Sequence, residues 1–189
     1  VDGFRYYVLS DTSYGNDGDF TYEGLVSRYN SDLANNLGNL AARIASVVDK
    51  KCAGLGTAPN PDSPLAAFAK DAVAETAACW QLVQPSRALE ATWSLIRATN
   101  AHLENHEPWK AEPSDLLNTV MGDALEALRI VTLLAFPAIP DTAREIWRRI
   151  GMTTDIEQCR IPVDTAWGLY RAGSPVEKGT PLFPRRTIA

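Results

Sequence analysis

The sequence lacks the features that define several common classes of protein. It has no apolar run near the roughly 20 residues that a membrane-spanning helix needs, and its first residues lack the charged-then-apolar order of a secretory signal. Only three cysteines occur, Cys52, Cys79 and Cys159, and their wide spacing fits neither a disulfide framework nor a structural zinc site. We therefore expect a soluble, cytoplasmic protein without a membrane partner, which folds without metal or disulfides.

Excess positive charge and catalytic motifs are also missing. The formal net charge is −5, which opposes the basic field of proteins that bind nucleic acid irrespective of sequence. The chain has no glycine-rich phosphate loop and no serine or cysteine in a nucleophile elbow, and its carboxylates are scattered. We therefore expect no catalytic residues in this chain, and any contact with RNA to be local.

What the sequence does contain is material for a helical core. Its 189 residues are 46% hydrophobic, enough for one domain and an appendage. A long helix is predicted from about Thr21, as N-cap, to Lys51, and its apolar stripe is Leu33, Leu37, Leu40, Ile44 and Val48. Because the sequence starts at Val1, within a stretch that reads as the middle of an element, we expect it to be part of a longer protein.

Further helices are predicted by apolar spacing and by their boundary residues. The opening residues Phe4, Tyr7 and Val8 suggest a short helix. Ser63 with Pro64, Ser86 and Asp141 are expected to cap three more, and another is expected to begin near Ser114. In chain order these four helices are expected to end near Val83, before Pro108, at Phe136 and at Gly151. The predicted inward residues of the last three are Leu89, Trp93, Ile96 and Leu103; Leu117, Val120, Met121, Leu128 and Val131; and Ile146, Trp147 and Ile150. The pattern predicts an all-α, antiparallel bundle of about five helices with an irregular C-terminal tail.

Two residues of the long helix could read the edge of an unpaired base. Asn39 and Arg43 are four residues apart and about 100° around from the leucine stripe, so both point outward. An amide offers a donor and an acceptor, and a guanidinium offers a planar fork. On most helices, however, an outward Asn and Arg are simply solvated, and the pair alone leaves both interpretations open.

Trp109 likewise has two interpretations. A tryptophan near a helix end is often a plug that closes a bundle, but here Pro108 restricts the loop and polar residues flank the ring. An exposed aromatic beside a helix that carries Asn and Arg is the layout of a single-stranded RNA reader. Asn100, on the stripe of Trp93, is expected to be structural and to bond the neighbouring loop. His102 and His106 are four apart, but with no third ligand nearby we expect no metal site.

Several segments together resemble the C-terminal half of a bacterial-type methionyl-tRNA synthetase. They are RYNSDL at 28–33, GNL at 38–40, EPW at 107–109, the run LLAFPAIPDTAREIWRRIG and the closing GTPLFPR. The resemblance covers nearly the whole chain. It implies a class I synthetase whose helical bundle binds the anticodon, with Asn39 and Arg43 on the first anticodon base and Trp109 stacking in the anticodon loop.

The same resemblance implies the partners and the domain boundaries. Residues 1–20 resemble the end of the stem-contact region that links to a catalytic domain, residues 21–160 the anticodon-binding domain, and residues 161–189 a tail that packs back on the bundle or the catalytic domain. The expected partners are methionine tRNA, through its anticodon loop, and the catalytic half of the synthetase. The family's two ATP-handling signatures are absent, so ATP and magnesium are expected to act in that other half, and this chain should not activate methionine alone.

Two alternatives stay open. Related bundles occur in valyl-, leucyl-, isoleucyl- and cysteinyl-tRNA synthetases, although Pro108-Trp109 with Asn39 and Arg43 favours methionine. A helical protein-interaction module, in which the face around Trp109 docks a partner, is the competing function.

Overall fold

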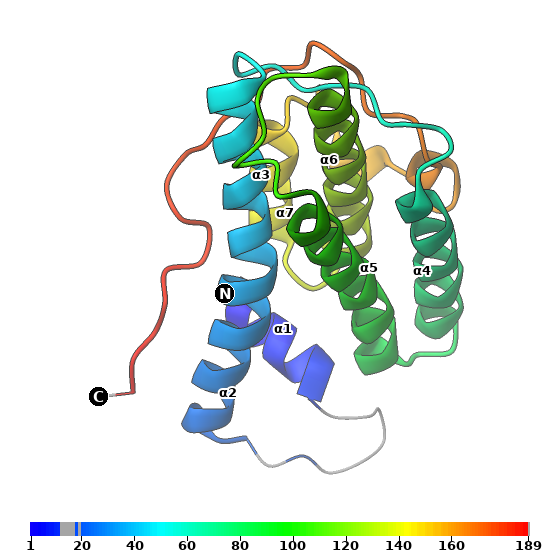
Figure 1. Ribbon diagram of the computed structural model, residues 1–189. Coiled ribbons are helices and arrows are strands. Elements are labelled where there is room, and N and C mark those ends of the chain that lie inside the picture. Colours follow the sequence, from blue (N-terminus) through cyan, green and yellow to red (C-terminus); the bar gives the residue numbers. More distant parts are fainter. Residues whose placement is uncertain (12–17, 19, 189) are drawn as a thin grey trace.

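The protein is a helical bundle with a long tail wrapped across it (Figure 1). The computed structural model describes residues 1–11, 18 and 20–188. Every regular element in these ranges is helical, as the sequence predicts, and none is long and apolar enough to cross a membrane. The elements are α1 (Asp2–Asp11), α2 (Tyr22–Arg28), η1 (Tyr29–Gly38), α3 (Asn39–Lys51), α4 (Pro64–Gln81), α5 (Pro85–His106), α6 (Asp115–Ala135), α7 (Pro140–Arg149), η2 (Ile156–Gln158) and η3 (Val163–Thr165).

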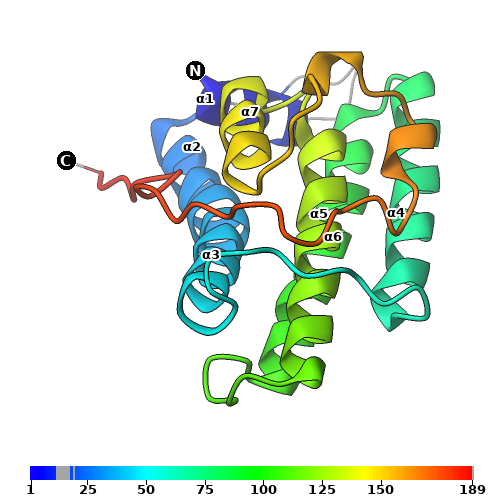
Figure 2. The same cartoon turned by 90° about the horizontal axis from the view of Figure 1, so that it is seen from above.

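Helix α6 is the centre of the bundle. Every residue from Val120 to Ala135 is buried, and α3, α4, α5 and α7 all pack against this helix. Seen from above, α4 lies on one side of α5 and α6, and the α2–α3 helix lies on the other (Figure 2). The leucine stripe predicted for the long helix is confirmed, because all five of its side chains are fully buried. The predicted inward residues of α5, α6 and α7 are buried as well.

Helix starts follow the predicted positions in three cases and differ in two. Thr21 and Ser63 each accept a backbone N–H in the first turn of their helices, as predicted, and Ser114, near which a helix was expected to begin, does the same. The predictions for Ser86 and Asp141 are wrong, because Pro85 and Pro140 occupy the first helical position. Proline has no N–H and its φ already suits a helix, so these helices begin two residues earlier than they would with Ser86 or Asp141 as the cap.

The long helix is not α-helical throughout, which corrects the prediction. Its central ten residues, η1, are wound as a π-helix, and the Asn39 N–H donates to the Ala34 carbonyl five residues earlier. A distant side chain explains part of this winding, because Trp93 Nε1 donates to the Asp32 carbonyl at 3.2 Å. A donor that binds a helical carbonyl from outside disturbs the regular ladder. The segment YNSDLANNLG is also rich in weak helix formers.

The opening helix forms as predicted, but its buried face differs from the predicted one. Tyr6 and Tyr7 are buried, whereas Phe4 and Val8 are about half exposed. Tyr6 is part of the main core and its hydroxyl donates to Asp32 Oδ2 at 3.0 Å. Because α1 packs against α5, residues 2–11 contribute directly to the core of the bundle.

A buried ion pair on α6 anchors the tail. Arg129 and Glu126 are almost fully buried and joined by two hydrogen bonds of 2.7 and 2.9 Å. Arg129 also donates to the carbonyls of Asp164 and Ala166, and Glu126 accepts the N–H groups of residues 168, 169 and 170. Two opposite charges can remain inside a protein only when they are paired and hydrogen-bonded. The irregular segment 164–170 supplies those bonds, so its path is fixed by α6.

A loop and the tail cross the bundle together. The Asp123 carboxylate on α6 accepts from Asn60 N at 2.7 Å and from Ser63 Oγ at 2.6 Å, which fixes the loop before α4. Gly122 lets this loop approach, since a Cβ there would lie 2.0 Å from the Ala58 carbonyl oxygen. Further along, Leu55 and Pro175 form a single antiparallel bridge. The loop after α3 and the tail therefore run side by side over α6 (Figure 2).

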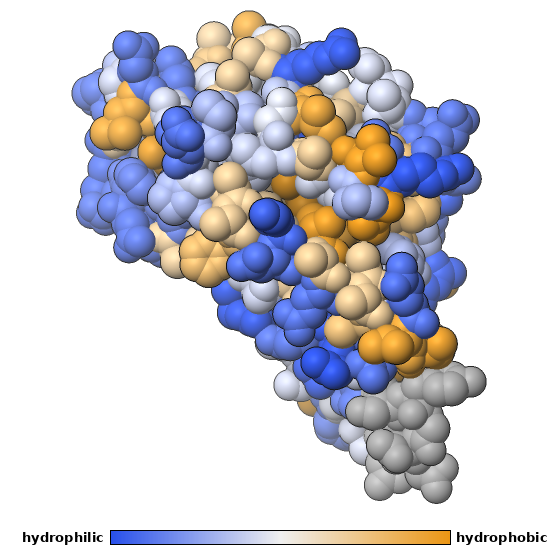
Figure 3. Space-filling model, turned by 90° about the vertical axis from the view of Figure 1, so that its right-hand side faces the viewer, coloured by the Kyte–Doolittle hydropathy of each residue, from blue (hydrophilic) through white to orange (hydrophobic). Residues whose placement is uncertain are grey.

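The face of the molecule beyond α4 carries a hydrophobic groove (Figure 3). One wall is the outward alanine face of α4, and the other is the tail segment from Ile161 to Trp167. Trp167 is held there by a 2.9 Å hydrogen bond from its Nε1 to the Asn60 carbonyl. Helix α4, which forms one wall of the groove, lies on the opposite side of the bundle from the long helix (Figure 1).

Replacing Arg129 with methionine should strongly destabilise the fold. The substitution keeps most of the side-chain volume but leaves the Glu126 carboxylate charged and buried without its partner, which costs about 3 to 5 kcal/mol. The measurement is the free energy of unfolding from urea titration. The control is Arg97→Met, which breaks an exposed pair with Glu90 and should cost no more than about 1 kcal/mol. Equal losses for the two variants would contradict this account of the pair.

Candidate nucleic-acid interface

The residues predicted to bind RNA come from two elements that meet at the surface. Arg43 lies on α3, and Trp109 lies in the loop between α5 and α6. The guanidinium carbon of Arg43 lies 4.6 Å from the centroid of the Trp109 ring. The structure therefore brings together two of the three predicted site residues as a stacked cation and aromatic ring.

The loop holds Trp109 through a tight turn. Glu107 ends α5 with φ of 41° and ψ of 52°, the left-handed conformation that non-glycine residues seldom adopt. The Lys110 N–H then donates to the Glu107 carbonyl at 2.8 Å, and their side chains pair at 2.6 Å. Pro108 is buried inside this turn. This turn thus fixes the backbone that carries Trp109.

Trp109 is neither a buried plug nor a fully exposed platform. Its side chain is half-buried, with one part packed against the hydrophobic core and another under Arg43. Its indole N–H makes no hydrogen bond to a residue that the structure describes. The part of the ring packed against the core fits the interpretation of a bundle plug, and the part under Arg43 fits the interpretation of a ring at the surface.

The position of Arg43 is set by two side chains of α5. Its Nη2 donates to Glu104 Oε1 at 2.5 Å, and its Nη1 donates more weakly to Asn100 Oδ1 at 3.4 Å. The Arg43 side chain remains 32% exposed and that of Glu104 59% exposed. An exposed ion pair contributes about 0 to 1 kcal/mol, and an exposed cation–π contact about 0.5 to 1 kcal/mol. A ligand of ordinary affinity can therefore displace the guanidinium from the ring.

Asn39 lies one helical turn before Arg43 and is exposed. It is the first residue of α3 after the π-helical segment. Its amide makes no hydrogen bond with any residue in the described ranges, so both its donor and its acceptor face solvent. The structure thus places Asn39 on the helix that presents Arg43, but it records no direct contact between Asn39 and Trp109.

Asn100 makes structural hydrogen bonds, as expected, but not to the expected partner. Asn100 was expected to bond the neighbouring loop, but it is half-buried, donates to the Ile96 carbonyl at 3.2 Å and accepts from Arg43. Glu104 was not singled out from the sequence. The sequence signal that could have found Glu104 is its spacing from Asn100. The two are four residues apart and therefore share one face of α5, just as Asn39 and Arg43 share one face of the long helix.

The two histidine rings at the end of α5 are in contact, with centroids 4.5 Å apart and planes tilted by 44° to each other. Burial, together with the neighbouring His106, lowers the pKa of His102 below its usual value. The structure groups no three potential metal ligands in the part of the chain it describes.

Truncating Arg43 to alanine should uncover the Trp109 ring. Collisional quenching of tryptophan fluorescence by acrylamide should increase, because the guanidinium no longer covers one face of the indole. The same substitution in a Trp109→Phe background should give no increase, which separates this ring from the other four tryptophans. Arg97→Ala, on an exposed turn of α5, is the matched control and should leave the quenching unchanged. An equal increase in the Trp109→Phe background would mean that Arg43 does not cover this ring.

The chain is similar over its whole length to known synthetases. Residues 1–45 match the family model described as tRNA synthetases class I (M). The methionine–tRNA ligase of Synechocystis is 33% identical over 97% of this chain and 38% of its own length, and that of Thermotoga maritima is 34% identical over 97% of this chain and 30% of its own.

Solved structures agree with the sequence comparisons. The free-state methionyl-tRNA synthetase of Mycobacterium tuberculosis superposes on all of this chain with a TM-score of 0.88 and 29% identity, over 39% of its own length. The same enzyme in complex with methionyl-adenylate gives a TM-score of 0.83. The chain thus spans about a third of the length of the relatives it matches. In both sequence and fold, the whole chain is therefore similar to one part, about a third, of bacterial methionyl-tRNA synthetases.

Proposed function

We propose that this chain is the anticodon-binding part of a methionine–tRNA ligase and that it selects the CAU anticodon of methionine tRNA. The observation that carries the proposal is the stacked Arg43–Trp109 pair at the surface. Single-stranded RNA is read by stacking an unpaired base on an aromatic ring and by hydrogen bonds to the edge of that base. Trp109 supplies the ring for stacking, and Arg43, which contacts that ring, supplies the hydrogen-bond donors.

Energetics favour exchange of the guanidinium for a base. Stacking of a base on an aromatic side chain is worth about 1 to 3 kcal/mol. The cation–π contact that it replaces is worth about 0.5 to 1 kcal/mol at an exposed site. A base that takes the ring face therefore compensates for the lost contact, and it leaves the donor fork of Arg43 free to turn toward the edge of the base.

The donors and acceptors of the site suit cytosine as the first anticodon base. The pairing edge of cytosine presents two acceptors, O2 and N3, next to an amino group. The Arg43 fork supplies two parallel donors, and the carboxamide oxygen of Asn39 is a free acceptor for the amino group. Uracil presents an N–H where cytosine presents N3, which would oppose a guanidinium donor. We therefore assign first-base selection to Arg43 and Asn39, and stacking to Trp109.

The remaining activity of the ligase is assigned to the rest of the longer enzyme. Relatives about three times as long carry the name methionine–tRNA ligase, and the ATP-handling signatures of the family are absent from this sequence. Methionine activation with ATP and magnesium is accordingly proposed for the catalytic half. The net charge of −5 gives little long-range attraction for RNA, so the affinity of this chain for an isolated hairpin should be modest.

The proposal is tested by titrating this chain with two RNA hairpins that differ only in the first anticodon base, one with CAU and one with UAU. Trp109→Ala should weaken binding of the CAU hairpin by about 5- to 150-fold, which corresponds to the stacking energy of one base. Phe68→Ala, which removes an exposed aromatic on α4, is the matched control and should leave the affinity unchanged. Equal binding of both hairpins by the wild-type chain, or none, would exclude anticodon recognition and favour the protein-interaction module.

A further inference from the structure

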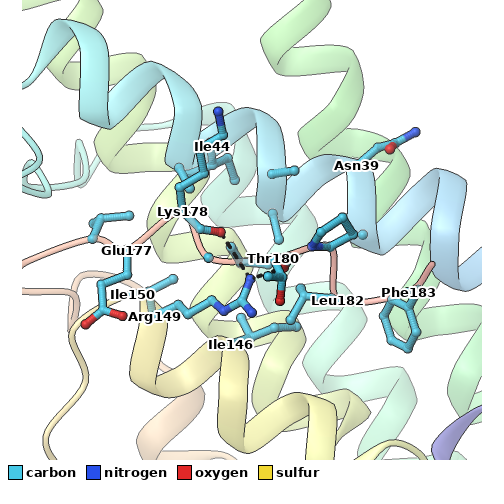
Figure 4. A pocket seen from close by; sticks show the side chains of 18 of the residues that line it. Asn39, Ile44, Ile146, Arg149, Ile150, Glu177, Lys178, Thr180, Leu182 and Phe183 are labelled. Carbon is cyan, nitrogen blue, oxygen red and sulfur yellow. Dashed lines mark hydrogen bonds between the residues drawn. The ribbon is translucent and has the colours of Figure 1, made fainter.

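The tail crosses the back of the helix that carries Asn39 and Arg43. We call residues 176–186 the strap; it runs from α7 past α3 and along η1 and α2 (Figure 1). In the close view, Asn39 projects away from the strap, whereas Phe183 lies on the strap beneath the helix (Figure 4). The Asn39 side chain thus points away from the strap (Figure 4), although Asn39 also lines the cavity between the strap and α3.

The recorded contacts between the end of the strap and this helix all fall on its π-helical segment. The Asn30 amide donates to the Arg186 carbonyl at 2.8 Å, and its oxygen accepts the Arg186 N–H at 3.0 Å. The Arg185 guanidinium donates to Asn35 Oδ1 at 2.8 Å. The Phe183 ring meets the Tyr29 ring edge to face, with centroids 5.9 Å apart.

Gly38, the last residue of η1, also lies against the strap. A Cβ at this position would be 3.4 Å from the Phe183 ring and 3.0 Å from the Leu33 carbonyl oxygen. The buried Phe183 ring therefore reaches the backbone at the point where π winding gives way to α winding.

The other end of the strap is fixed independently of this helix. Arg149 on α7 donates through Nη1 to the carbonyls of Lys178 and Thr180, at 3.1 and 2.7 Å, and through Nε to Glu145 at 2.6 Å (Figure 4). Hydrogen bonds from Arg148 and Arg149 lower the pKa of Glu145 to about 2, although burial opposes them. The strap is therefore a bridge from α7 to η1.

Between its two ends, the strap leaves α3 loosely packed. A cavity of about 250 Å³ separates the strap and α7 from α3, and small residues such as Ala41, Ala42 and Ala45 line its α3 side. The strap consequently acts on the long helix mainly at η1 and little at α3 itself.

Winding in η1 sets the direction in which α3 presents its side chains. A π-helix turns through a smaller angle per residue than an α-helix, because its hydrogen bonds span five residues instead of four. Any residue that changes from π to α winding therefore rotates α3 relative to α2. Asn39 is the first residue after η1, and Arg43 is one turn further on.

We propose that Asn30 is a positioning residue for anticodon recognition, because its two hydrogen bonds to the strap hold η1 in its π winding and thereby aim Asn39 and Arg43. This inference rests on the proposed function. Asn30 itself does not touch the RNA. It acts through the first turn of α3.

The test compares Asn30→Ala with the wild-type chain in binding the CAU and UAU hairpins. Loss of the strap contact should reduce the affinity for CAU by about threefold to tenfold, because small errors in the placement of a binding group are costly, and leave the affinity for UAU unchanged. The ratio of the two affinities should fall by the same factor. If Asn30→Ala only destabilised the fold, it would lower the fraction of folded chain and reduce the apparent affinities for both hairpins equally.

The matched control is Glu157→Ala, which breaks another contact between the tail and the bundle, the 2.6 Å pair with Arg144 on α7. Its affinity ratio should equal that of the wild-type chain. In an Asn39→Ala, Arg43→Ala background, Asn30→Ala should produce no further change in the ratio, because the groups that it positions are gone.

The outcomes separate this inference from the function on which it rests. A wild-type chain that discriminates between the hairpins, with an Asn30→Ala variant that discriminates equally well, overturns the positioning role and leaves the proposed function intact. A wild-type chain that binds both hairpins equally overturns both.

Discussion

The structure depends on the need to satisfy the charged groups of its central helix. Helix α6 is buried along most of its length, yet it carries Asp123, Glu126 and Arg129. An unpaired charge at such a position would cost several kcal/mol. The protein avoids that cost by bringing two irregular segments to α6, the loop before α4 at Asp123 and the tail at the Glu126–Arg129 pair. The core of the bundle therefore determines the course of segments that have no regular structure of their own.

This constraint extends from the core to the surface. Once the tail is fixed at residues 164–170, it continues past α7, where Arg149 holds it, and reaches the π-helical segment at Asn30. Helix α3 then presents Asn39 and Arg43, and the turn at Glu107 presents Trp109 from the other side. The proposed anticodon site is thus built by one helix face and one loop, each fixed by contacts outside the site. An exposed ion pair and a cation–π contact hold Arg43 in place, and both are weak enough to yield to a base.

The parts of the fold that follow from local chemistry were predictable from the sequence. Leucine spacing located the buried face of the long helix, and Thr21, Ser63 and Ser114 marked three helix starts. Ser86 and Asp141 were misleading because a neighbouring proline decided the boundary. The π-helical segment could not be read from spacing, since it involves a hydrogen bond from Trp93, which lies 61 residues away from Asp32 in the sequence. For the same reason the sequence marked Arg43 and Trp109 as candidate residues but did not predict the contact between them, nor Glu104 as the partner that holds Arg43.

The central claim is that Trp109 and Arg43 exchange their mutual contact for contacts with the first anticodon base. The most direct measurement is an NMR experiment on this chain bound to a CAU hairpin, with the Trp109 indole assigned by substitution. The account predicts intermolecular NOEs between the indole ring protons and H5 and H6 of the first anticodon cytosine, together with loss of the NOEs from the Arg43 side chain to that ring. A bound hairpin with no NOE to the indole, and with the Arg43 contacts to the ring unchanged, would contradict it.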